Sequence, residues 1–155
     1  MILSPDKYLL DDQGNYLWSR ERVGRAWAQV TYEAPYLLWT KLYKRLVLMV
    51  GLPASGKSTW LEAHDEKDTL FVDATFVDAS QRKPFVKMAQ KYGVPVDVVV
   101  MDTPLEVVLS RNALRPASRR PDEVTLEEWH QRLLKSPPTQ DEGFRTLVVV
   151  PYQPS

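Results

Sequence analysis

The amino-acid sequence predicts an α/β fold in which five mostly parallel strands form one sheet with helices on both faces. The first sign is a set of short apolar runs, which we expect to be strands, at residues 2–4, 45–50, 69–73, 96–102 and 146–150. The second is that stretches with helical spacing separate the later runs. Because a crossover helix returns the chain to the same end of a sheet, this alternation favours parallel strands.

Each expected helix is marked by its apolar spacing or by the residues at its ends. The helices are expected at about 20–44, 57–63, 80–92, 104–115 and 125–134. Pro35 should break or kink the first of them, because proline lacks the backbone donor. Gly93 and Pro95 end the third, and Pro104 suits the first turn of the fourth.

Composition limits the possible functions. The 155 residues suit a single domain, 1–155, with 20 basic and 20 acidic side chains that cancel. This balance argues against a broad, non-specific nucleic-acid surface. Without cysteine, the chain can form neither disulfides nor a thiolate zinc site, and two histidines are too few for a metal cluster. No apolar run approaches the roughly 20 residues that cross a bilayer, so we expect a cytoplasmic protein without membrane contact.

Residues 51–58, Gly-Leu-Pro-Ala-Ser-Gly-Lys-Ser, have the spacing of a phosphate-binding loop, or P-loop. In such a loop the backbone amides hold phosphates, Lys57 neutralises the β and γ oxygens, and the Ser58 hydroxyl binds Mg²⁺. A strand ends just before the loop and a helix begins just after it, as this motif requires. The cofactors predicted are therefore ATP and Mg²⁺. The loop residues expected to contact them are Gly51, Ala54, Ser55, Gly56, Lys57, Ser58 and Thr59.

Two further features fit phosphate chemistry. Asp73 closes a strand where it could hold the Mg²⁺ shell, although it could also be a simple strand-end cap. Arg111 and Arg115 lie four residues apart and so share one helix face, where they could close over the nucleotide as a lid. Arg119 and Arg120 follow in a loop. The alternative is that these arginines are solvated and only complement the helix dipole.

Three segments resemble the P-loop polynucleotide 5′-hydroxyl kinase-like family, within the adenylate-kinase-like phosphotransferases. They are residues 51–60, residues 71–75 (Phe-Val-Asp-Ala-Thr) and residues 111–115 (Arg-Asn-Ala-Leu-Arg). The resemblance covers residues 45–150 and implies a P-loop NTPase fold. It also implies that Arg115 grips the phosphates in the transition state, that Arg111 supports the lid, and that Thr75 contacts the acceptor phosphate.

One departure from the family concerns the general base. In the family, a strand between the P-loop helix and the Asp-x-Thr strand ends in the aspartate that activates the acceptor hydroxyl. Here only about ten residues separate Trp60 from Leu70, too few for that unit. Residues 2–8 resemble the missing piece, so we hypothesise that segment 1–44 has moved ahead of the P-loop strand and that Asp6 is the base. Asp6 could instead be a surface turn residue, and Leu9 stands where the family often has an arginine for the acceptor's 3′ phosphate.

The remaining aromatic and basic residues have simpler interpretations. Base stacking by Tyr16 and Trp18 is possible in principle, but core packing is favoured. We expect three tryptophans to lie on helix faces that cover the sheet: Trp27, Trp39 and Trp60. Arg82 and Lys83 could extend a basic track towards the acceptor, although a plain structural position is favoured.

The sequence therefore predicts an ATP-dependent phosphotransferase that acts on the 5′-OH end of DNA or RNA. A small-molecule or nucleoside and sugar kinase is one alternative, with a small hydroxyl acceptor, and Leu9 and the neutral net charge favour it mildly. An ATP-dependent switch without a phosphoryl acceptor is another. The sequence gives no indication of an oligomeric state.

Overall fold

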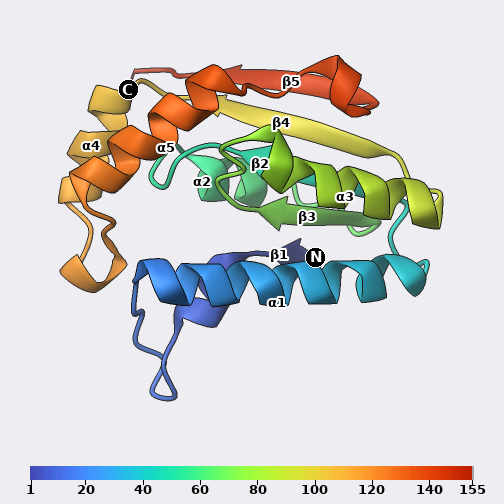
Figure 1. The fold of residues 1–155 in the computed structure, drawn as a ribbon, viewed down its shortest axis with the longest axis horizontal. Coiled ribbons are helices and arrows are strands. Elements are labelled where there is room, and N and C mark those ends of the chain that lie inside the picture. The colour runs from blue at the N-terminus through green and yellow to red at the C-terminus, as the bar shows by residue number, and fades with distance from the viewer. Residues whose placement is uncertain (155) are drawn as a thin grey trace.

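Five strands form one parallel sheet in the computed structural model, which describes residues 1–154 (Figure 1). The strands are β1 (Ile2–Leu3), β2 (Arg45–Val50), β3 (Thr69–Asp73), β4 (Val96–Asp102) and β5 (Thr146–Pro151). Their order across the sheet is β1-β3-β2-β4-β5, and every neighbouring pair is parallel. The predicted α/β class and the five parallel strands are confirmed.

The first strand of the chain joins the sheet at its edge, outside β3. Ile2 pairs with Phe71 and Leu3 with Val72, so β1 runs beside the strand that ends in Asp73. Leu3 is buried in the main core, which anchors this short strand. β1 thus forms one edge of the sheet, beside β3.

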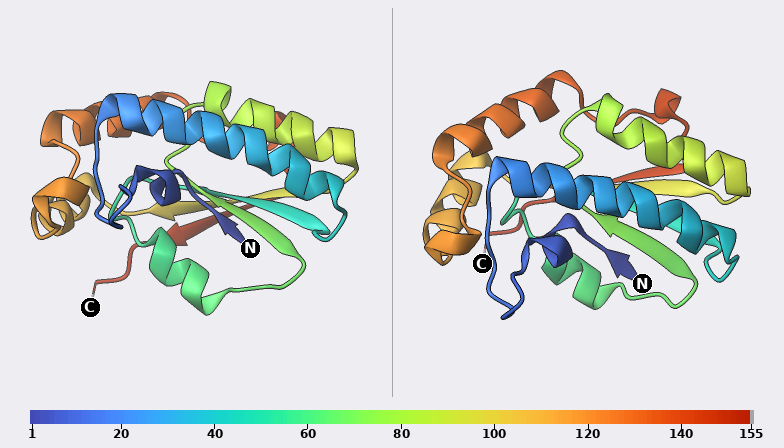
Figure 2. Two further views of the ribbon diagram at one scale, coloured as in Figure 1. Left: turned by 90° about the horizontal axis from the view of Figure 1, so that it is seen from below. Right: turned by 60° about the horizontal axis from the view of Figure 1, so that its bottom comes forward.

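The helices cover the two faces unequally. They are α1 (Arg20–Trp39), α2 (Lys57–Ala63), α3 (Ala79–Tyr92), α4 (Leu105–Ala113) and α5 (Glu123–Lys135). Figure 2 shows α1, α3 and α5 on one face and α2 on the other. The larger core lies under α1 and α3, and a smaller core packs Leu61 of α2 against Val47 and Phe71. Within residues 1–154, no helix is both long and apolar enough to span a bilayer.

Side-chain caps fix where three of the helices begin. Ser19, Asp78 and Asp122 each accept a hydrogen bond from a backbone N–H one turn into α1, α3 and α5, respectively. Gly93 ends α3 in the left-handed region, with φ of 68°. These ends agree with the predicted helices to within two residues.

Pro35 does not break α1, the first of the two outcomes, a break or a kink, that the sequence predicted. The helix continues through it to Trp39. Val30, Ala34 and Leu38 form one buried stripe on both sides of the proline. Packing of this stripe against the sheet outweighs the single backbone hydrogen bond that proline removes. The helix nevertheless ends earlier than the predicted residue 44.

Two of the three tryptophans expected to cover the sheet do so. The ring of Trp27 packs edge-on against Phe76 at a centroid distance of 5.0 Å, and Trp60 packs against Phe71 at 6.4 Å. Trp39 is 63% exposed, so that expectation is wrong. It follows Leu38, which takes the buried position at the end of α1, and the 100° step of a helix turns Trp39 to solvent.

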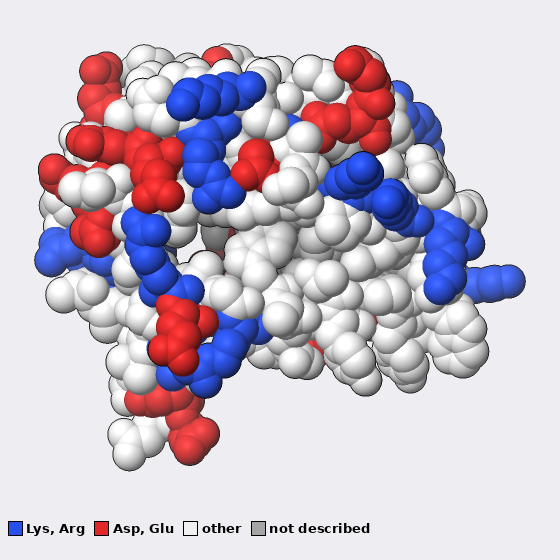
Figure 3. Space-filling view, in the orientation of Figure 1, with Lys and Arg blue, Asp and Glu red and all other residues white. Residues whose placement is uncertain are grey.

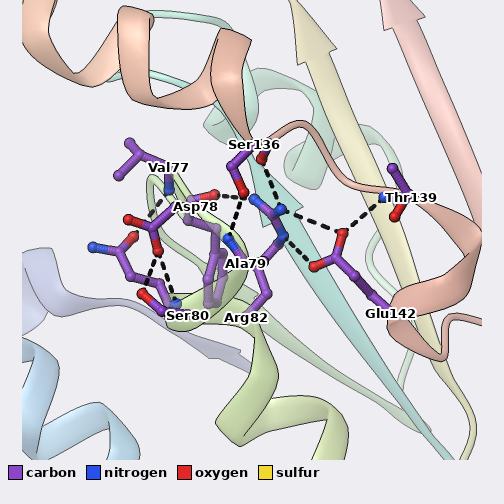
Figure 4. Close-up of polar contacts among 10 residues, drawn as sticks. Val77, Asp78, Ala79, Ser80, Arg82, Ser136, Thr139 and Glu142 are labelled. Atoms are coloured by element: carbon purple, nitrogen blue, oxygen red, sulfur yellow. Dashed lines mark hydrogen bonds and ion pairs between the residues drawn. The ribbon is translucent and has the colours of Figure 1, made fainter.

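Arg82 is a buried structural residue and does not belong to a surface basic track. Its side chain has no exposed area and binds both carboxylate oxygens of Glu142, at 2.8 and 3.3 Å (Figure 4). The guanidinium also donates to the carbonyl oxygens of Phe76 and Ser136, at 2.8 and 2.7 Å. Arg82 therefore joins the start of α3 to the segment between α5 and β5.

Candidate active site

The predicted P-loop lies between β2 and α2, as the motif requires. It leaves the end of β2 and turns into α2 at Gly56, which has φ of 102° and so favours glycine. A side chain at Gly51 would bring its Cβ within 2.7 Å of the Ser55 Oγ. Thr103 on the loop after β4 fixes the P-loop from outside by donating to the Ser55 carbonyl at 2.8 Å. Both glycine positions are therefore dictated by the shape of the loop.

Hydrogen bonds to the P-loop backbone hold the side chain of Lys57. Its Nζ donates to the carbonyl oxygens of Gly51 and Leu52, at 2.8 and 3.0 Å, and lies 3.9 Å from Asp73 Oδ1. Burial lowers the pKa of Lys57, while the charges of Asp73 and Asp6 oppose that change. Burial likewise raises the pKa of Asp73 against the opposing charge of Lys57. Both shifts arise because a charged group is taken out of water beside an opposite charge, and perturbed groups of this kind cluster at functional sites.

Asp73 and Ser58 fit a magnesium ion shared with phosphates. Among the side chains of residues 1–154, the Asp73 Oδ1 is a buried oxygen without a hydrogen-bond partner. Ser58 is exposed on the same cavity, one residue after Lys57. No cluster of three or more His, Cys, Asp or Glu in this part of the chain could hold a metal alone. Magnesium commonly binds through one or two protein oxygens and completes its shell with phosphates and water.

The segment after β1 brings a carboxylate to the same place. Asp6 lies in a 3₁₀ helix, Pro5–Leu9, that Ser4 caps, and its Oδ1 accepts a hydrogen bond from the Tyr16 hydroxyl at 3.0 Å. The Asp6 side chain lines the cavity with Lys57, Asp73 and Thr75.

Leu9, at the other end of that 3₁₀ helix, is 1% exposed and packs with Tyr16 and Ala26. This position therefore offers no positive charge to an acceptor.

Three arginines from α4 and the following loop also line the cavity. Arg111 donates to the Ala54 carbonyl at 3.3 Å, and its guanidinium lies over the ring of Tyr152. Arg119 lies over the ring of Tyr16, 4.9 Å from the centroid. Within residues 1–154, Arg111, Arg115 and Arg119 have no ion pair with a carboxylate. Guanidinium groups left without acidic partners beside a P-loop are suited to phosphate.

Two hydrogen bonds position the loop that carries these arginines. Asn112 is buried, and its amide nitrogen donates to the Pro121 carbonyl at 2.9 Å, which returns the loop to α4. The backbone N–H of Trp18 donates to the Ser118 carbonyl at 3.1 Å, which joins the loop to the N-terminal segment. Arg120 binds the Ala113 carbonyl and lies outside the cavity lining. The loop is thus held near its C-terminal end by α4 and near its middle by the N-terminal segment.

All these groups meet in one cavity of about 420 Å³. From the P-loop and α2 it is lined by Ala54, Gly56, Lys57, Ser58 and Thr59. From elsewhere in the chain come Asp6, Asp73, Thr75, Arg111 and Arg115. Gly51 and Ser55 are buried and are not among the lining residues. Figure 3, drawn in the orientation of Figure 1, shows a hollow in the surface, with basic and acidic side chains intermixed around it.

No sequence motif indicates that Trp129 of α5 belongs to the cavity wall. It lines the cavity beside Trp18, for which base stacking was the less favoured of two interpretations, with their ring centroids 6.4 Å apart. Their separation in the chain hides this pairing, because neither lies in a motif and periodicity reports only the local face of a helix. Asn112 lies inside the Arg-Asn-x-x-Arg segment, but only the fold shows that it supports the loop.

Comparison with known proteins supports the same chemistry. Residues 63–136 match a family model described as an AAA domain, which covers the region from the end of α2 through α5. The chain is also similar to a bifunctional polynucleotide phosphatase/kinase from Schizosaccharomyces pombe (strain 972 / ATCC 24843). The two are 21% identical over 150 residues, an alignment that covers 77% of this chain and 36% of the relative. This chain therefore spans little more than a third of that protein.

Proposed function

The fold, the P-loop and both comparisons support membership of the P-loop polynucleotide-kinase-like family, and from that premise we propose an ATP-dependent 5′-hydroxyl kinase. The proposed reaction moves the γ-phosphate of ATP to the 5′-OH end of DNA or RNA. One observation carries the proposal. Asp6, in the segment that follows β1, lines the same cavity as Lys57 and the arginines at positions 111, 115 and 119. These residues come from three separate parts of the chain, and phosphoryl transfer needs all three kinds of group.

The proposed transfer is an in-line displacement. The acceptor oxygen forms a bond to the γ-phosphorus while the bond from phosphorus to the β,γ-bridging oxygen breaks, which leaves ADP. Asp6 accepts the hydroxyl proton, and its hydrogen bond to Tyr16 fixes the orientation of the carboxylate. Thr75 lines the same cavity, and in this proposal it contacts the acceptor.

Positive charge provides most of the remaining stabilisation. Lys57 from the P-loop and Arg115 from the lid would neutralise the β and γ phosphates of bound ATP, with Arg111 in support. Ser58 and Asp73 would hold a magnesium ion, which would supply further positive charge to the phosphates. In this proposal the arginine loop beside the cavity also helps to keep water from competing with the acceptor.

A small alcohol or sugar acceptor is the second candidate. The buried Leu9 removes one expected contact to a polynucleotide, and the net charge of zero gives the chain little general attraction for nucleic acid. A screen of acceptors under the same conditions separates the two candidates, because only the first requires a nucleic-acid 5′ end.

The proposal is tested by transfer of label from γ-labelled ATP to a short 5′-OH oligonucleotide in the presence of Mg²⁺. Lys57→Ala should abolish transfer, whereas the matched control Lys67→Ala, which changes an exposed lysine outside the cavity lining, should retain it. If wild type binds ATP but no label reaches the oligonucleotide, the polynucleotide acceptor is rejected. Label on a small alcohol would then support the second candidate, and slow hydrolysis alone would support a switch.

A further inference from the structure

Two tryptophans in the cavity wall take no part in the proposed transfer. Trp18 precedes α1, Trp129 lies on α5, and their rings meet edge to face at an interplanar angle of 68°. Both side chains are half-buried and line the cavity. Trp27 also reaches the cavity, but its ring packs on Phe76 and Phe85 and belongs to the core. Tyr16 lines the cavity too, but it is buried and Arg119 covers its ring. Trp18 and Trp129 are therefore the aromatic surface that a ligand in the cavity would meet.

This aromatic corner lies on the side of the proposed base. Trp18 is two residues from Tyr16, whose hydroxyl binds Asp6. On the other side of the P-loop, Arg111 lies over Tyr152, which follows β5 at the opposite edge of the sheet from β1. Tyr152 is not among the cavity residues. An acceptor whose hydroxyl reaches Asp6 would therefore have its adjoining group beside Trp18.

A positive charge accompanies the aromatic corner. Arg119 lies over the ring of Tyr16 and lines the cavity, with no carboxylate partner among residues 1–154. The lid loop that carries it is joined to the Trp18 backbone through Ser118. Flat rings beside an unpaired guanidinium are complementary to an aromatic base joined to a phosphodiester.

We propose that Trp18 and Trp129 hold the nucleobase of the acceptor's terminal nucleoside, while Arg119 faces the phosphodiester that follows it. The acceptor is then a base-bearing 5′-hydroxyl end, and a sugar or simple alcohol lacks the group that the corner binds. This inference rests on the proposed kinase function. It adds that the site recognises the base next to the reacting hydroxyl. This recognition does not require an arginine for the acceptor's 3′ phosphate at the position of Leu9.

The test compares two oligonucleotides that differ only at the 5′-terminal residue. One carries a normal nucleoside, and the other carries an abasic residue that keeps the 5′-hydroxyl and the phosphodiester. For wild type, loss of the base should lower kcat/KM by about tenfold, because stacking on aromatic side chains is lost. Trp18→Ala should use both acceptors equally, at the lower rate. The matched control Trp39→Ala changes an exposed tryptophan and should discriminate as wild type does.

The outcomes separate this inference from the function beneath it. If wild type phosphorylates both oligonucleotides equally well, base recognition is overturned while the kinase function stands. If wild type phosphorylates neither, the proposed function itself fails. The wild-type comparison does not depend on the folding of any variant. Trp18→Phe keeps a ring and should retain most of the discrimination, and its loss in that variant would also contradict stacking.

Discussion

Replacing Arg82 should destabilise the fold far more than replacing an exposed arginine that forms an equally short ion pair. Arg82→Met keeps much of the apolar volume but removes four hydrogen bonds, to Glu142, Phe76 and Ser136. It leaves a carboxylate that is only 16% exposed without its cation. Removing one member of a buried pair costs about 3–5 kcal/mol, and the partial exposure of Glu142 places the expectation near the lower figure.

The matched control is Arg25→Met. Arg25 pairs with Glu21 at 2.8 Å along α1, but the two side chains are 71% and 81% exposed. Such a pair contributes about 0.5 kcal/mol or less, so the control should unfold almost as wild type does. For a domain of this size, a loss of about 3 kcal/mol lowers Tm by roughly 6–12 °C. Thermal and urea unfolding of both variants measure the difference.

Two results would refute this reasoning. One is that Arg82→Met and Arg25→Met shift the midpoint equally, because burial would then have no effect. The other concerns the double variant Arg82→Met with Glu142→Gln, which removes the uncompensated charge and should recover part of the lost stability. A double variant less stable than Arg82→Met alone would show that the carboxylate without its arginine is not the source of the cost.

The other predictions concern the lid and the pH dependence of folding. Arg115→Ala should lower kcat by roughly 100-fold or more while ATP binding changes little, because the Arg115 charge stabilises the transition state. Arg120→Ala is the control. Equal kinetics for the two variants would exclude the role of Arg115. Burial acts to raise the pKa of Asp97, but hydrogen bonds from Arg145 and Thr146 outweigh it and hold the pKa below its usual range. Asp97 therefore stabilises the fold above its ordinary pKa of about 3.9, and the contribution is lost as pH falls through the lowered value. Asp97→Asn should accordingly reduce stability at neutral pH and much less near pH 2, as denaturant midpoints measured across that range would show, and an equal loss at both would contradict the assignment.

Local patterns were sufficient to predict most of the sheet. Strands β2, β3 and β4 have the bounds expected from their apolar runs, because a strand buried on both faces leaves a continuous signal. Pairing between distant segments leaves no such signal. The burial of Arg82 depends on Glu142, sixty positions away, and the exposure of Trp39 depends on where α1 leaves the sheet.

The candidate site was predictable where a motif fixes it. The P-loop needs its glycines and Lys57 at set spacings, so those positions follow from the sequence alone. Placing Asp6 required the family resemblance, because nothing local shows that β1 pairs outside β3. Trp129 was not predicted because Trp18, its neighbour in the cavity wall, lies on a segment far from it in the chain.

The role of Asp6 as general base is tested most directly by single-turnover transfer from γ-labelled ATP to a 5′-OH oligonucleotide, with ATP binding measured on the same samples. Asp6→Asn should lower the transfer rate by roughly 100-fold or more while ATP affinity stays close to that of wild type. Asp12→Asn, in the exposed turn that follows, is the matched control and should transfer normally. Transfer by Asp6→Asn at the wild-type rate would contradict a base carried by the N-terminal segment.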